Sequence, residues 1–250
     1  MTRRRLDAEL VRRGLVSSRE QGRAAIEGGR VSVSGVTATK AATQVDDAAP
    51  IELVAEPGSD FVSRGAHKLI GALDAFGLDV RDANALDAGA STGGFTQVLL
   101  QRGARHVIAV DVGYGQLAWS LRSDDRVTVL ERTNVRHLDA SRDELPYLPD
   151  LVVADLSFIS LTAVLPALVT VAAPAANLVL MVKPQFEVGK ERVGSGVVTS
   201  PDLRREAVAR VVSAAEAEKV AIFGVAASPL PGPKGNVEYF LWMGKGGGDA

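Results

Sequence analysis

Four charged side chains of mixed sign stand where they could take part in proton transfer. Asp155 and Lys183 each end an apolar run that is typical of a buried strand. Lys68 begins a predicted helix, and Glu238 lies on a late predicted strand, after a loop rich in proline and glycine. Because ligands of open α/β sheets bind beyond the carboxyl ends of the strands, Asp155 and Lys183 indicate a site at that edge.

Lysine is scarce in this chain, which has seven lysines against 21 arginines. A lysine can lose its proton when burial or a neighbouring cation depresses its pKa, whereas a guanidinium stays charged. Each of the four residues, taken alone, could equally form a salt bridge at the end of its element. Their joint placement favours a site that performs acid–base chemistry.

The elements that must position these residues alternate between strand and helix from residue 63 onward. This alternation predicts a doubly wound, Rossmann-like α/β sheet with a mainly parallel core. The predicted strands lie near 85–87, 107–111, 127–130, 151–155, 178–182, 220–225 and 237–243. The predicted helices lie near 68–76, 94–102, 116–122, 161–170 and 202–218.

A glycine-rich segment follows the first of these strands. Compared with the dinucleotide pattern G-x-G-x-x-G, Gly89 and Gly94 match the first and third glycines, and Ser91 replaces the second. The second glycine lets the backbone approach a pyrophosphate, so its loss favours a nucleoside ligand without phosphates, such as S-adenosyl-L-methionine. Asp111, at the end of the second strand, is placed to bind ribose hydroxyls. A turn that only packs the helix on the strand is the alternative.

Three further residues at strand ends are weaker candidates for the same ligand. Asp87 could orient its methionine end through the loop backbone, and Asn134 with Val135 could meet its adenine edge. Asp87 and Asn134 could equally cap their own turns. The predicted cofactor-binding residues are Asp87, Gly89, Ser91, Gly93, Gly94, Phe95, Asp111, Asn134 and Val135.

The first 54 residues form a small predicted unit of two short helices followed by short strands. The first helix is expected to end at Gly14, and the second to be capped by Ser17 or Ser18. Residues 1–30 hold eight basic and four acidic side chains, so the net charge of −2 for the whole chain conceals a basic helix pair. This helix face could be merely solvated, or it could neutralise RNA phosphates. The predicted RNA-binding residues are Arg3, Arg4, Arg5, Arg12, Arg13, Arg19, Arg23 and Arg30.

Composition excludes several classes of site. The chain has no cysteine, which removes disulfides, thiolate zinc sites and cysteine nucleophiles, and its three histidines show no metal-ligand spacing. No signal peptide is evident, so we expect a cytoplasmic protein.

Residues 156–182 carry no charge and are long enough for a membrane span. However, Pro166 and Pro174 interrupt this stretch, which favours a buried helix and a buried strand.

The N-terminal unit resembles the S4 RNA-binding domain, which implies that its helix face binds RNA. Ser34 and Ala41 depart from the family pattern, both in the turn region away from that face. The residues that carry the resemblance are Arg5-Leu6-Asp7, Leu10-Val11, Gly14-Leu15, Ser18-Arg19, Gly29-Arg30-Val31 and Gly35.

Nearly the whole chain resembles the TlyA family of rRNA 2′-O-methyltransferases, once called haemolysins. The matching segments are Ser63–Leu69, Leu86–Phe95, Asp111–Gln116, Ala154–Ser160, Val182–Glu187 and Gly235–Tyr239. The resemblance implies a Lys-Asp-Lys-Glu tetrad shared with the FtsJ-type ribose methyltransferases. Its positions here are Lys68, Asp155, Lys183 and Glu238.

The chemistry expected of this tetrad is the transfer of a methyl group to a ribose 2′-hydroxyl. We hypothesise that Lys183 is the general base, favoured in its neutral form by nearby Lys68 and by the cationic sulfonium. Asp155 would orient that lysine and the methyl donor, and Lys68 and Glu238 would position the ribose. Much of the acceleration would come from alignment of hydroxyl, methyl and sulfur.

The resemblance also implies the partner, which is ribosomal RNA within ribosomal subunits. It implies cytidine targets in 16S rRNA, 23S rRNA or both, with loss of modification affecting sensitivity to capreomycin and viomycin. Met1–Arg5 resembles the longer N-terminus of members that act on both subunits.

The alternatives are a membrane-active haemolysin, suggested by the uncharged stretch, and an RNA-binding protein without catalysis. The sequence leaves the oligomeric state open.

The expected organisation has four parts. They are an S4-like domain over 1–54, a linker over 55–62, an FtsJ-like methyltransferase domain over 63–245 and a flexible tail over 246–250.

Overall fold

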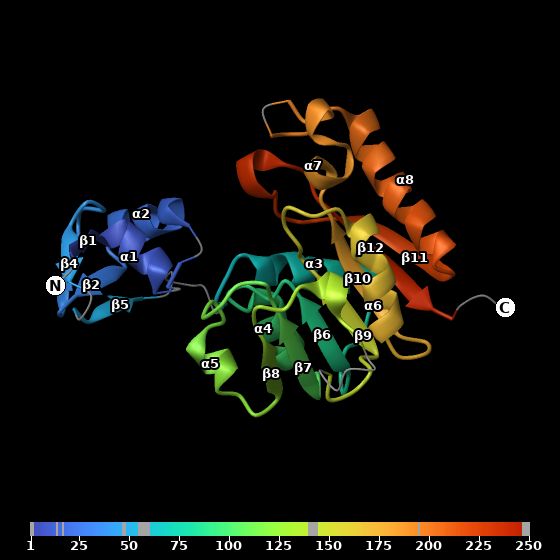
Figure 1. Cartoon of the computed structure of the whole chain (residues 1–250), viewed down its shortest axis with the longest axis horizontal. Coiled ribbons are helices and arrows are strands. Elements are labelled where there is room, and N and C mark those ends of the chain that lie inside the picture. Colours follow the sequence, from blue (N-terminus) through green and yellow to red (C-terminus); the bar gives the residue numbers. More distant parts are fainter. Residues whose placement is uncertain are drawn as a thin grey trace.

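The computed structural model describes residues 3–13, 15–16, 18–46, 49–54, 61–139, 145–194 and 196–246. They form a smaller N-terminal lobe and a larger C-terminal lobe (Figure 1). The predictions made for Gly14, Ser17, residues 55–60 of the linker and residues 247–250 of the tail lie outside the described residues.

The smaller lobe packs two helices against short antiparallel strands. Its helices are α1 (Leu6–Arg12) and α2 (Arg19–Glu27). Its strands are β1 (Arg3–Arg5), β2 (Val31–Val33), β3 (Val36–Thr37), β4 (Gln44–Asp46) and β5 (Ile51–Leu53). Ser18 caps α2 by accepting a hydrogen bond from the Gln21 amide, as predicted. The helices bury Leu6, Leu10 and Ile26 against the strands, which closes a small core of their own.

The larger lobe is built on a seven-stranded sheet in the order β11-β12-β10-β9-β6-β7-β8. Its strands are β6 (Asn84–Ala88), β7 (His106–Val110), β8 (Val127–Leu130), β9 (Leu151–Ala154), β10 (Asn177–Val182), β11 (Val220–Ala227) and β12 (Tyr239–Lys245). β12 runs antiparallel to both of its neighbours, and the remaining pairs are parallel. The predicted Rossmann-like, mainly parallel sheet is confirmed.

Helices cover both faces of this sheet, so its central strands are apolar on both sides (Figure 1). On one face lie α3 (Gly65–Phe76), α4 (Gly94–Gln101) and α5 (Trp119–Arg122). On the other lie α6 (Leu165–Val171) and α8 (Pro201–Ala217). Short helical segments are η1 (Val135–His137), η2 (Leu161–Ala163), α7 (Pro184–Glu187), η3 (Lys190–Arg192) and η4 (Pro233–Gly235).

The uncharged stretch 156–182 divides into η2, α6 and β10. Its apolar side chains belong to the main core, since Leu165, Leu168 and Leu180 are fully buried between sheet and helices. The expected buried helix and buried strand are confirmed. Within the part of the chain that the structure describes, no helix combines the length and apolarity that a membrane crossing requires.

Several predicted boundaries were wrong by a few residues. α3 begins at Gly65, so Lys68 lies within its first turn instead of starting it. Glu238 precedes β12 and is not on a strand. The helix expected over 116–122 is shortened to α5 because Ala118 is extended, with φ −55° and ψ 140°. The helix expected over 161–170 is split into η2 and α6, with Pro166 in the first turn of α6, where proline is tolerated.

Candidate active site and cofactor pocket

The topology brings the predicted catalytic residues to one edge of the sheet. Lys183 and Glu238 take the next positions beyond the last paired residues of β10 and β12, which are antiparallel neighbours. Asp155 follows β9, the parallel neighbour of β10 on its other side. Lys68 reaches the same region from α3. The carboxyl edge of the sheet therefore gathers all four, as expected for a ligand site in an α/β sheet.

The four residues are arranged as two ion pairs. Lys183 Nζ lies 2.6 Å from Asp155 Oδ1 and donates a hydrogen bond to Ser157 Oγ at 2.9 Å. Lys68 Nζ donates to Glu238 Oε2 at 2.6 Å. The side chain of Glu238 is fully buried, and those of Lys183 and Lys68 are 8% and 11% exposed. Each buried charge has a partner, which such charges require in a low-dielectric interior.

A tight loop covers the carboxylate of Glu238. A Cβ added at Gly232 would collide with Glu238 Oε1, so a larger residue here would displace the carboxylate. Asn236 fixes the end of the loop, because its side chain accepts from the Val198 amide at 3.0 Å and donates to the Gly196 carbonyl at 2.9 Å. Glu238 Oε1 is buried without a described hydrogen-bond partner, which leaves it able to accept a hydrogen bond from a ligand hydroxyl.

Asp87 is a second buried acid, located at the end of β6. Its Oδ2 accepts a hydrogen bond from Thr96 Oγ1 at 2.7 Å, and its Oδ1 has no described partner. Burial in the core raises the pKa of Asp87 to about 7, although the bonds from Thr96 oppose that shift. Asp87 thus ties β6 to α4 and keeps one acceptor unused.

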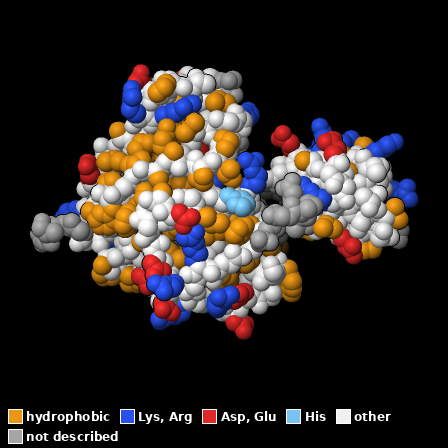
Figure 2. Space-filling model, turned by 180° about the vertical axis from the view of Figure 1, so that it is seen from behind, with side chains coloured by type: hydrophobic (Ala, Val, Ile, Leu, Met, Phe, Trp, Pro, Cys, Tyr) orange, Lys and Arg blue, Asp and Glu red, His pale blue; other side chains and the backbone are white. Residues whose placement is uncertain are grey.

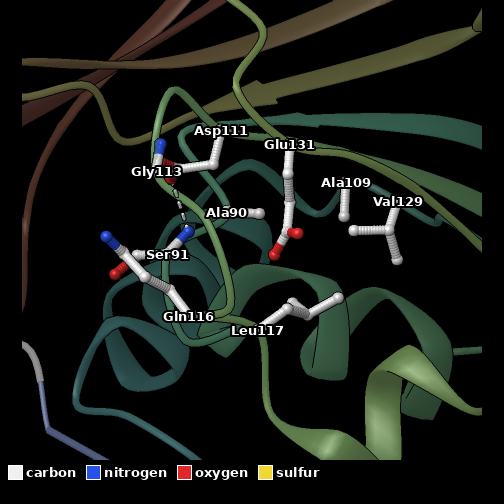
Figure 3. A pocket seen from close by; sticks show the side chains of 9 residues that line it. All are labelled: Ala90, Ser91, Ala109, Asp111, Gly113, Gln116, Leu117, Val129 and Glu131. Atoms are coloured by element: carbon white, nitrogen blue, oxygen red, sulfur yellow. Dashed lines mark hydrogen bonds between the residues drawn. The ribbon is translucent and has the colours of Figure 1, made fainter. Parts of the chain in front are cut away.

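A cavity opens where the loops after β6, β7 and β8 meet (Figure 3). Asp111 joins two of these loops, because its Oδ2 accepts from the Ser91 amide at 2.8 Å and its Oδ1 from the Gly113 amide at 2.7 Å. A carboxylate has further lone pairs, so Asp111 can still accept hydroxyl hydrogen bonds. The cavity is lined by Ala90, Ser91, Ala109, Asp111, Gly113, Gln116, Leu117, Val129 and Glu131.

The glycines of the loop serve close contacts within the protein. Gly89 has φ +86°, and a Cβ there would lie 2.9 Å from the Asp155 carbonyl oxygen. A Cβ at Gly94 would collide with Ser63 at the entry to α3, and one at Gly93 with Leu121 of α5. The loop is therefore packed directly against the segments that carry Asp155 and Lys68, which links the cofactor pocket to the four charged residues.

Other predicted cofactor residues lie away from the cavity. Asn134 caps η1 by accepting from the Arg136 amide at 3.0 Å, which is the alternative that the sequence left open. Val135 is buried in the main core, and Phe95 packs against Phe240 with ring centroids 6.1 Å apart. None of these three residues lines the cavity.

Three further residues of the site, Glu131, Gln116 and Ser157, were not predicted from the sequence. Glu131 follows β8 directly, accepts from the Gly115 amide at 2.7 Å and is paired with Arg122. Its carboxylate lies between Ala90 and Leu117 in the cavity (Figure 3). The strand-end rule that singled out Asp111 applies equally to Glu131 and would have found it. Only the fold brings Ser157 to Lys183.

The predicted RNA-binding arginines are spread over more than the helices. The expectation of a single helix face was wrong, because β1 carries Arg3, Arg4 and Arg5, and Arg30 directly precedes β2. The remaining positions are Arg12 on α1, Arg13 just after it, and Arg19 and Arg23 on α2.

Two family models match the chain. The model described as FtsJ-like methyltransferase matches residues 61–245, and that of the S4 domain matches residues 4–49. The first covers most of the larger lobe and the second most of the smaller lobe.

Individual relatives match over almost the entire length. The 16S/23S rRNA (cytidine-2′-O)-methyltransferase TlyA of Mycobacterium tuberculosis is 58% identical over 96% of this chain and 90% of its own. The YqxC protein of Bacillus subtilis is 42% identical over 97% of this chain and 87% of its own. A solved structure from Streptococcus thermophilus that carries a hemolysin name superposes with a TM-score of 0.77 at 38% identity, covering 98% of this chain and 89% of that one. The chain belongs to the TlyA family of methyltransferases, in which an S4 domain precedes an FtsJ-like domain.

Proposed function

We propose that this chain methylates the ribose 2′-hydroxyl of cytidines in 16S and 23S ribosomal RNA, with S-adenosyl-L-methionine as the methyl donor. The observation that carries the proposal is the presence of two ion pairs with buried lysines, Lys183 with Asp155 and Lys68 with Glu238. They lie at the sheet edge that adjoins the glycine loop. The relationship to TlyA supports the choice of substrate.

The side chains that line the cavity offer the polar and apolar groups that a nucleoside cofactor needs. Asp111 and Glu131 offer carboxylate oxygens for ribose hydroxyls, and the apolar side chains of Leu117 and Val129 offer a surface for the adenine ring. Asp87 is fully buried outside the cavity lining, so its carboxylate would act on the cationic methionine end of the ligand through the loop. When bound, S-adenosyl-L-methionine supplies a methyl group on a sulfonium that an oxygen nucleophile can displace.

Lys183 is placed to remove the proton from the ribose hydroxyl. It stands at the end of a rigid central strand, and contacts to Asp155 and Ser157 fix its Nζ in two directions. To act as a base it must first release a proton, which an arginine in the same position could not do. Lys68 and the free oxygen of Glu238 lie on the other side of β10 from Asp155, where they can hold the ribose. Holding the hydroxyl in line with the methyl group supplies a large part of the rate enhancement.

The smaller lobe would bring the enzyme to its substrate. We propose that residues 1–54 form the RNA-binding domain and residues 63–245 the catalytic domain, joined by the linker 55–62. Ribosomal RNA within assembled subunits would be the partner, which places the reaction in the cytoplasm.

The direct test incubates the purified chain and S-adenosyl-L-methionine with ribosomal subunits from a strain that lacks a homologous enzyme. Mass spectrometry of RNA digests should reveal new 2′-O-methylcytidine in both 16S and 23S rRNA. Modification of only one subunit would restrict the proposal to that subunit. Absence of any 2′-O-methylation, together with leakage of dye-loaded liposomes, would refute the proposal and favour a membrane-active protein.

Asp87 predicts that cofactor binding depends on pH. Burial raises the pKa of Asp87 to about 7. At lower pH the carboxyl group is therefore protonated and loses the negative charge that attracts a cationic ligand. We expect affinity for S-adenosyl-L-methionine to rise about fivefold to tenfold between pH 6 and pH 8 and then to level off. Calorimetry should show this rise for the wild type and a flat profile for Asp87→Asn. A flat wild-type profile would contradict the assignment.

The same pKa shift predicts how stability without cofactor depends on pH. The folded form keeps the Asp87 proton up to about pH 7, whereas an unfolded carboxyl loses it near pH 4. The unfolded state therefore binds fewer protons in this window, and this group makes stability fall as the pH rises from about 4 to 7. Thermal unfolding of Asp87→Asn should lack this contribution.

Glu187 is expected to hold the loop that carries Asp155. Glu187 is the buried last residue of α7, and its carboxylate accepts from Ser160 Oγ at 2.5 Å and from the Leu161 amide at 2.8 Å. Glu187→Ala would leave the amide unpaired, at a cost of about 1–3 kcal/mol, and would loosen the loop. We expect kcat to fall more than KM changes, with most activity retained in Glu187→Gln because the amide oxygen can still accept. Steady-state kinetics of both variants, with thermal unfolding as control, test this role; an alanine variant with wild-type kcat would exclude it.

A further inference from the structure

The arginines of the smaller lobe are organised around two buried carboxylates. Asp7 and Glu9 lie in the first turns of α1, and both are 0% exposed. Carboxylates are rarely buried this fully unless they are paired. Within the described residues, five arginines surround them: Arg4, Arg5, Arg12, Arg13 and Arg19.

Asp7 connects three elements. Its two oxygens accept from Arg5 Nε and Nη2, both at 3.0 Å, which is the bidentate geometry of a strong arginine–carboxylate pair. Arg19 Nη2, from the start of α2, donates to the same carboxylate at 2.9 Å. Gly22 lets α2 come close, since a Cβ there would lie 3.2 Å from the Asp7 carbonyl oxygen. Asp7 thereby fixes one arginine of β1 against one of α2.

Glu9, in the same turn of α1, binds the arginines at the C-terminal end of that helix. It accepts from Arg12 Nε at 2.7 Å and from Arg13 Nε at 2.7 Å, and Arg4 Nη1 lies 3.9 Å away. Arg13 also donates to the carbonyls of Asp46 and Ala49. Hydrogen bonds from these guanidiniums hold the pKa of Glu9 at about 2, and those from Arg5 and Arg19 hold the pKa of Asp7 at about 2. Both acids are therefore charged at any physiological pH.

The carboxylates and the arginines that bind them differ in their exposure to solvent. The carboxylates are fully buried, whereas the five arginine side chains remain between 21% and 56% exposed. The guanidiniums of Arg5, Arg12, Arg13 and Arg19 are therefore held by hydrogen bonds from the protein side while their side chains stay partly exposed. A guanidinium has five N–H groups in a rigid fork, which suits it to contact a carboxylate and a phosphate together. Figure 2 shows basic side chains on the surface of the smaller lobe, with a few acidic ones among them.

We propose that Asp7 and Glu9 are positioning residues that set the spacing of a guanidinium array for the backbone phosphates of a folded RNA. The proposal rests on the RNA substrate proposed above. Flexible arginines would lose side-chain entropy on binding, whereas this array has lost it on folding. The two acids reduce the positive charge of the surface, and they fix where the remaining charge lies. Recognition of one RNA shape then depends on the positions of the guanidiniums more than on the net charge of the surface.

The test compares variants that each remove one negative charge. Asp7→Asn and Glu9→Gln free the arginines, whereas Glu27→Gln, an exposed position at the end of α2, raises the charge equally without touching the array. Full-length variants are titrated with unmodified ribosomal subunits and with an unrelated RNA duplex at several salt concentrations. If net charge governs binding, all three should bind more tightly.

We expect Asp7→Asn and Glu9→Gln to bind the subunit about tenfold more weakly, with binding of the unrelated duplex unchanged or tighter. KM for the subunit should rise while kcat at saturation is kept, and Glu27→Gln should behave like the wild type or bind slightly more tightly. Equal subunit affinity for Asp7→Asn and Glu27→Gln would overturn the proposal.

A further variant, Arg5→Lys, tests the proposal even if Asp7→Asn or Glu9→Gln fails to fold. Arg5→Lys keeps the charge at a half-exposed site but cannot form the two-pronged contact with Asp7. Its thermal unfolding should stay near that of the wild type, and its subunit affinity should fall about as far as that of Asp7→Asn. Wild-type affinity in Arg5→Lys would also overturn the proposal. Failure of the wild type itself to methylate rRNA would instead refute the proposed function, so the two outcomes are distinct.

Discussion

Lys183→Arg should fold normally and lose methyl transfer by a factor of about 10²–10⁴, the usual contribution of a general base. Arginine keeps the positive charge, so the attraction to Asp155 at the end of β9 persists. It remains protonated at any usable pH and therefore cannot accept the proton of the ribose hydroxyl. The loss should appear in kcat, because the charge pattern that meets the RNA is unchanged.

The measurement is single-turnover transfer of a labelled methyl group to ribosomal subunits. Lys219→Arg is a matched control, since it makes the same change at an exposed residue just before β11, away from the site. Calorimetry with S-adenosyl-L-methionine and thermal unfolding should show that Lys183→Arg still binds cofactor and is folded. If Lys183→Arg retains full activity while folded, Lys183 is not the base.

Gly89→Ala should damage stability and cofactor binding together. Alanine at φ +86° costs about 1–2 kcal/mol from backbone strain alone. Its Cβ would also lie 2.9 Å from the Asp155 carbonyl oxygen, which belongs to the backbone and cannot rotate away. Overpacking of this kind costs a further 1–3 kcal/mol or so. The displacement moves both the glycine loop and the segment that carries Asp155, so affinity for S-adenosyl-L-methionine should fall by about tenfold or more.

Gly235→Ala separates strain from collision. Gly235 has φ +85°, and a Cβ there would meet nothing within 4 Å, so this variant should lose only the strain contribution. Chemical denaturation of both variants gives the difference in stability, and calorimetry gives the difference in cofactor affinity. Equal stability losses in Gly89→Ala and Gly235→Ala would show that the loop yields to the extra methyl group and that the close approach to Asp155 is not required.

The strand-end rule explains why much of the site was predictable. A strand that is buried on both faces is a continuous apolar run, and the first polar residue after it marks the carboxyl edge of the sheet. Asp111, Asp155 and Lys183 were found in this way, and Glu131 obeys the same rule after β8. Asn134 also met a form of this rule but caps its own turn, because a polar side chain beyond a strand can bond locally before it reaches a ligand.

Counting charges did not reveal the role of the acidic residues in the smaller lobe. The first thirty residues hold four acidic side chains besides eight basic ones, and a count of charges gives the acids no role beyond lowering the net charge. Two of them, Asp7 and Glu9, are fully buried beneath the arginines and hold them in place. A composition cannot distinguish an acid that neutralises a surface from one that organises it, because the difference lies in burial and geometry.

The sequence by itself determined the class of fold, the edge of the sheet where chemistry occurs and the residue types available there, since periodicity and strand ends are local properties. Only the tertiary structure decided which of these side chains pair with one another. Lys68 meets Glu238 across 170 positions of the chain, and Lys183 meets Asp155 and Ser157 from a neighbouring strand. Such pairings depend on sheet order and antiparallel register, which arise when distant segments are buried together and which no local pattern encodes.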